Sequence, residues 1–132
     1  MYSSLSWIEW LDRLDRVLGG AREDVAALSR AVGPRSLAPI ERSKRQLSAL
    51  IHDLRLLNRN VLSVDATAST ADLADNLQRA LDTTVFHMAS LAQVPAAGPT
   101  AIRKRELAAI AAALRDSSYE AAVLLEPRRR RA

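Results

Sequence analysis

The chain has 132 residues, 48% hydrophobic and 26% charged, which is typical of one folded domain rather than a disordered chain. Aromatic residues make up only 4% and cysteine is absent, which argues against an all-β fold and excludes disulfides and thiolate chemistry. The formal net charge of +4 equals the charge of Arg128, Arg129, Arg130 and Arg131, so the rest of the chain is neutral.

The first predicted helix runs from about Leu5 to Ala31. Its apolar residues form a stripe along one face of the helix, and their spacing continues unchanged across Gly19-Gly20, which favours one long helix. Two shorter helices are the alternative, because each glycine costs about 1 kcal/mol relative to alanine and the pair can kink the chain. The apolar residues recur three and four positions apart: Trp7, Leu11, Leu14, Leu18, Ala21, Val25, Leu28 and Val32.

The second predicted helix starts at Pro39, with Ser36 as a capping residue, and frays near residues 63–65. From Leu47 onward its apolar residues alternate at spacings of three and four, the pattern of a helix that packs along one seam. The seam comprises Ile40, Leu47, Leu50, Leu54, Leu57, Val61 and Val64.

The third predicted helix is capped by Ser69 or Thr70 and ends at Pro95. The fourth is capped by Thr100 and ends at Pro127, since proline interrupts helices. The two seams comprise Ala74, Leu77, Leu81, Thr84, Met88 and Leu91 in the third helix, and Leu107, Ile110, Leu114, Ser117, Ala121 and Leu124 in the fourth.

Four helices of similar length joined by short connections predict an all-α fold, an up-down-up-down antiparallel four-helix bundle over residues 1–126. Residues 127–132 form a short, basic, disordered tail in this interpretation. A helical hairpin that completes its bundle by dimerising is the alternative. Thr84 and Ser117 lie on the seams, where each hydroxyl can bond to the preceding turn or, if the two face each other, set the helix register.

The sequence does not predict a metal or cofactor site. Neither histidine has a glutamate three positions before it, and the glutamates miss the seams, unlike the ligands of di-metal bundles. No phosphate-binding glycine loop or serine nucleophile motif is present. His87 lies beside the third seam, where we expect a hydrogen bond to a backbone or hydroxyl group.

His52 is expected on the outer face of the second helix, opposite Leu54. The tetrapeptide 52–55, His-Asp-Leu-Arg, resembles the His-x-Leu-Lys/Arg core of histidine phosphotransfer domains, which are also small four-helix bundles. The resemblance implies that His52 is a phosphoacceptor and that Arg55, with Arg45 or Arg59, positions acidic groups of a receiver. The chain departs from that family at Leu56, where a small residue is usual. A surface histidine on a solvated face is the alternative.

The first two helices carry more apolar residues than one buried stripe needs. In the first helix Trp10 and Val17 widen the apolar face to which Trp7 belongs, and in the second helix Ile51 and Leu56 lie outside the seam. Large apolar patches rich in tryptophan often bind other proteins, so we expect these five residues to form a partner surface or, alternatively, part of the core. In the fourth helix, Tyr119 is expected on the outer side.

These features favour a non-enzymatic protein–protein interaction module: a small adaptor, a chaperone-like accessory subunit or an assembly factor that forms homodimers. Histidine phosphotransfer through His52 is the alternative. Nucleic acid is expected to bind only through Arg128, Arg129, Arg130 and Arg131, which can contact phosphates or an acidic protein surface. With no targeting segment or membrane span, we expect a soluble, cytoplasmic protein, and the Arg-, Ala- and Leu-rich composition is typical of a GC-rich bacterial genome.

Overall fold

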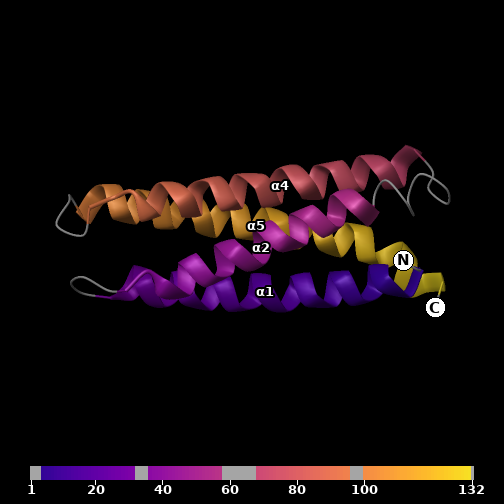
Figure 1. Ribbon diagram of the computed structural model, residues 1–132, viewed down its shortest axis with the longest axis horizontal. Helices are drawn as coiled ribbons and strands as arrows, with labels where there is room; N and C mark the ends of the chain where they lie inside the picture. The colour runs from indigo at the N-terminus through magenta and orange to yellow at the C-terminus, as the bar shows by residue number, and fades with distance from the viewer. Residues whose placement is uncertain (1–3, 32–35, 58–67, 96–99, 132) are drawn as a thin grey trace.

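In the computed structural model, the described residues form four α-helices that lie along one long axis (Figure 1). They are α1 (Ser4–Arg30), α2 (Ala38–Leu57), α4 (Ala68–Ala92) and α5 (Thr100–Arg131). The structure describes residues 4–31, 36–57, 68–95 and 100–131, with the side chains of all but 4–7, 68–71 and 126–131.

The helices form a closed ring of contacts. α1 packs on α2, α2 on α4 and α4 on α5, and α5 returns to pack on α1. Successive helices run in opposite directions, so α1 begins and α5 ends at the same end of the bundle (Figure 1). The predicted up-down-up-down four-helix bundle is confirmed, and its largest contact is between α4 and α5.

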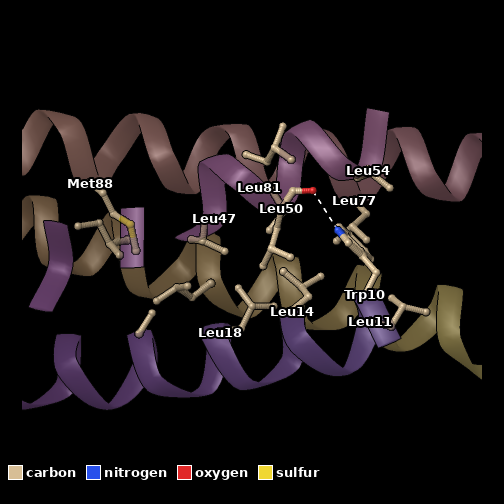
Figure 2. Packing of buried hydrophobic residues seen from close by; sticks show 14 of the residues in the cluster. Trp10, Leu11, Leu14, Leu18, Leu47, Leu50, Leu54, Leu77, Leu81 and Met88 are labelled. Atoms are coloured by element: carbon tan, nitrogen blue, oxygen red, sulfur yellow. Dashed lines mark hydrogen bonds between the residues drawn. The ribbon is translucent and has the colours of Figure 1, made fainter. Parts of the chain in front are cut away.

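The predicted seams form the core of the bundle. In α4 all six seam residues, Ala74 to Leu91, are buried, and the described seam residues of α2 are buried too. Figure 2 shows leucines from α1, α2 and α4 meeting between the helices, among them Leu14, Leu47 and Leu81. Because each seam removes apolar surface from water, its burial is the main favourable contribution to folding.

α1 is one continuous helix across Gly19-Gly20, as predicted. A Cβ atom added at either glycine would meet nothing within 4 Å, so no close approach of a neighbouring helix requires glycine there. The pair therefore weakens α1 without any compensating contact within the described chain.

Replacing either glycine by alanine should stabilise the protein. We expect Gly19→Ala and Gly20→Ala each to raise the free energy of unfolding by about 0.5–1 kcal/mol, since alanine loses less backbone entropy in a helix. Urea unfolding followed by circular dichroism measures the change. Ala27→Gly, at an exposed alanine of the same helix, is the matched control and should lower stability similarly. A loss of stability in Gly20→Ala would contradict a continuous α1.

The sequence correctly places the start of α2 and the end of α4. It misplaces the start of α4, where the predicted caps Ser69 and Thr70 lie inside a helix that begins at Ala68, and it misplaces the end of α5. Ser36 Oγ accepts a hydrogen bond from Ala38 N at 3.2 Å, which confirms its capping role, and α4 ends before Pro95. The prediction that Pro127 ends the last helix is wrong, because α5 continues to Arg131. Proline removes one backbone hydrogen bond, but its fixed φ is itself helical, so the backbone can continue beyond it.

A hydroxyl pair links α4 and α5 inside the core. Thr84 and Ser117 are fully buried, and their oxygens lie 3.2 Å apart. Thr84 Oγ1 also lies 2.8 Å from the carbonyl oxygen of Ala80, to which it donates its only hydroxyl proton. Ser117 must therefore donate to Thr84 Oγ1. The expected bond to the preceding turn therefore holds for Thr84, whereas Ser117 makes the contact between the two helices.

The two members of this pair should respond differently to mutation. Thr84→Val leaves the Ser117 hydroxyl buried without its acceptor, so we expect a loss of about 1–3 kcal/mol in the free energy of unfolding. Ser117→Ala leaves Thr84 bonded to Ala80 and should cost less. Urea unfolding of both variants and the double variant tests this. Equal losses that simply add would show that the two hydroxyls do not interact.

Candidate functional site

The expected partner surface on α1 and α2 is largely part of the core. Trp10 is 4% exposed, and its indole Nε1 donates a hydrogen bond to the carbonyl oxygen of Leu50 at 3.0 Å (Figure 2). Ile51 is 6% exposed. The expectation that these two residues face outward is wrong, because the long indole reaches across to α2 and finds a partner for its polar N–H.

The other three residues of that expected surface lie differently. Val17 and Leu56 are half-buried, and Val17 packs against the core cluster. The side chain of Trp7 lies outside the described residues. The surplus apolar residues of α1 and α2 therefore mostly thicken the core instead of leaving an apolar patch open to water.

His52 is exposed opposite the buried Leu54, as predicted, and lies within the last two turns of the described α2. Arg45 and Arg55 are exposed on the same helix, whereas Arg59 lies outside the described residues. Within the described part of the chain, His52 has no hydrogen-bond or ion-pair partner. Its imidazole is accessible to a reactant, with arginine side chains one and two turns away along the helix.

His87 faces a carboxylate instead of the backbone or hydroxyl group that we expected. Its Nδ1 lies 3.6 Å from Oε2 of Glu106 on α5, and both atoms are shielded from water without a hydrogen-bond partner. The Phe86 ring lies edge-on to the imidazole at 5.4 Å. Sequence analysis identified His87 but missed Glu106, because only the packing of α4 on α5 brings the two together.

The outer surface of α4 and α5 carries most of the exposed apolar side chains. Phe86 and Tyr119 are each 65% exposed, and Ile102 is 41% exposed. The fourth large exposed hydrophobic residue of the described chain is Ile8 on α1, at 38%. Tyr119 was expected on the outside, whereas Phe86 was not singled out, since one aromatic residue next to a seam carries no periodic signal.

A shallow hollow of about 410 Å³ lies beside Tyr119 on the same surface. Its lining combines one arginine with two acidic residues, so both signs of charge face one open space. The lining residues are Asn76, Arg79 and Ala80 from α4 and Asp116, Tyr119 and Glu120 from α5. Tyrosine and arginine are enriched where protein surfaces meet, whereas aspartate and glutamate are more typical of the polar rim.

The part of the chain that the structure describes contains neither a candidate metal site nor a candidate membrane span. No group of three or more His, Cys, Asp or Glu side chains among the described residues could hold a metal ion. None of the helices, over the residues that the structure describes, has the length and apolarity to cross a bilayer. The side chains of Arg128, Arg129, Arg130 and Arg131 lie outside the described ones, so their contact with nucleic acid or acidic surfaces stays a prediction.

Comparisons with protein-family models, with curated proteins and with solved structures find no match to this chain.

Proposed function

We propose that the protein is a non-enzymatic helical protein–protein interaction module, such as a small adaptor, chaperone-like accessory subunit or assembly factor, and that it self-associates. The observation that carries the proposal is the position of Phe86 and Tyr119, each 65% exposed on neighbouring helices. The proposed contact surface is thus the outer face of α4 and α5, in place of the face of α1 and α2 expected from the sequence.

The energetics of exposed aromatic residues support this choice. The chain has five aromatic residues, and two of them lie mostly in water although the core could bury them favourably. Covering apolar surface contributes roughly 25 cal/mol per Å², and aromatic residues are enriched among those that contribute most to binding. Ile102 and the mixed charges beside Tyr119 extend the same surface.

Removing the two aromatic rings should weaken self-association without unfolding the bundle. We expect wild-type protein to sediment as more than one chain at high concentration, and Phe86→Ser/Tyr119→Ser to sediment as single chains over the same range. Sedimentation equilibrium measures both masses. Ile8→Ser, an exposed hydrophobic residue of α1, is the matched control and should behave as wild type. Because all three side chains are exposed, thermal unfolding should change little.

Two results would contradict this proposal. One is a wild-type mass equal to one chain at every concentration, with no partner that co-purifies. The other is an assembly that Ile8→Ser weakens as much as the double aromatic variant, which would move the contact to another face.

A second candidate function is histidine phosphotransfer, favoured by the exposure of His52 on the outer face of α2. In this function a ring nitrogen of His52 attacks the phosphorus of an aspartyl phosphate on a receiver protein, and the aspartate carboxylate leaves. Arg55 would stabilise the acidic groups of the receiver during the transfer. The half-buried Leu56 borders the approach one turn further along the helix.

Phosphorylation by phosphoramidate, a small phosphoryl donor, tests the second candidate. We expect an acid-labile phosphate that is lost in His52→Ala and kept in His87→Ala, since the chain has two histidines. Arg55→Ala should leave this reaction unchanged and slow transfer from a phosphorylated receiver several-fold, because the guanidinium stabilises the acidic groups of the receiver. Intact mass and ³¹P NMR follow the product. Modification of both histidines at the rate of free imidazole would rule out a specialised role for His52.

A further inference from the structure

The outer surface of α5 carries a second seven-residue pattern, on the side opposite the core residues Leu107 and Leu114. We call it the outer stripe. Its members are exposed or half-buried in the single chain, and their spacing alternates between three and four. This spacing is typical of a helix that packs along another helix. The stripe consists of Ile102, Arg105, Ala109, Ala112, Asp116 and Tyr119.

We propose that the outer stripe is the contact between two copies of this chain, packed antiparallel about a two-fold axis. The inference rests on the proposed self-association and names its partner and register. A two-fold contact uses the same surface on both copies, so the surface must be complementary to itself. In an antiparallel helix pair, residues equally distant from the axis on either side face each other.

An axis between residues 110 and 111 pairs every member of the outer stripe with a suitable partner. Arg105 faces the partner's Asp116, Ala109 faces the partner's Ala112, and Ile102 faces the partner's Tyr119. Each pair occurs twice, so the contact contains two ion pairs, two alanine pairs and two apolar pairs. Arg105 and Asp116 have no ion-pair partner within the described single chain, which leaves both available.

The charges also select against other arrangements. A parallel pair would place Arg105 beside the partner's Arg105 and Asp116 beside the partner's Asp116, and like charges across a helix contact are destabilising. An antiparallel pair shifted by seven residues would separate both ion pairs. The alanines at the centre let the two helices approach closely, and the flanking Arg115 lies next to the partner's Ala108 instead of another cation.

Phe86 lies beside the proposed axis. On α4 it stands between Thr84 and His87, which contact Ser117 and Glu106 of α5. Those two α5 residues bracket the central alanines, so Phe86 is level with the middle of the stripe. The two-fold axis therefore brings Phe86 close to the partner's Phe86. The contact covers Phe86, Ile102 and Tyr119, three of the four large hydrophobic residues that are exposed in the described chain.

A charge-exchange experiment on the full chain tests the register. Arg105→Asp alone and Asp116→Arg alone each create two like-charge pairs in the dimer. We expect each variant to raise the dimer dissociation constant about tenfold or more, since like charges at an interface cost several kcal/mol. In a heterodimer formed from an equimolar mixture of the two variants, both pairs between positions 105 and 116 again have opposite charges. We therefore expect the mixture to form a heterodimer with nearly wild-type affinity.

Sedimentation equilibrium gives the dissociation constants, and native mass spectrometry distinguishes the heterodimer from the homodimers. Arg13→Asp and Asp12→Arg, exposed on α1, control for the change in net charge and should leave the affinity unchanged. Circular dichroism confirms that each variant is folded.

The outcomes separate the register from the proposed function. If wild-type chains assemble and the double aromatic variant does not, while the charge variants have no effect, the register is wrong and the interaction module stands. If the mixture stays as single chains although wild type dimerises, the antiparallel pairing is wrong. If wild type never assembles, the proposed dimer contact fails, and the interaction module fails with it when no partner co-purifies.

Discussion

Burial of one leucine-rich seam on each helix is the interaction on which the rest of the structure depends. The seams at three- and four-residue spacing leave each helix with a single apolar face, and only a ring of four helices covers all four faces. Leucine seams specify register poorly by themselves, because many leucine–leucine contacts are nearly equivalent. Two polar contacts supply the register: the Trp10 indole on Leu50 between α1 and α2, and Ser117 on Thr84 between α4 and α5.

Much of this fold could be predicted from the sequence, because the helical period is a local property of the chain. The seams, the continuity of α1 and the order of the helices all follow from spacing and capping. The side-chain reach of Trp10 does not, since periodicity gives the direction in which a residue points and not how far its side chain extends. Ile51 is next to the seam residue Leu50 in α2, and it is buried at the edge of a core wider than the seam alone. At Pro127 the lost backbone hydrogen bond opposes a helix, whereas the fixed φ of proline permits one. The residue type alone therefore does not decide where α5 ends.

The candidate site was less predictable, because its parts come from different helices. The contact between His87 and Glu106 and the hollow beside Tyr119 both need α4 and α5 at a particular register. The exposure of His52 could be predicted from its place opposite Leu54. The apolar surplus on α1 and α2 is mostly buried, since a wide apolar face indicates a thick core as readily as a partner surface.

The alanine-rich middle of α5, from Ala108 to Ala113, bears on how quickly contacts there form and break. Alanine has no rotamers to lose when it is covered, and Phe86 and Tyr119 each have only two side-chain torsions to restrict. Ordering this surface therefore carries a small entropic penalty, and its small central side chains offer little area to resist separation. Such a surface suits short-lived encounters that respond to local protein concentration, in contrast to permanent subunit assembly.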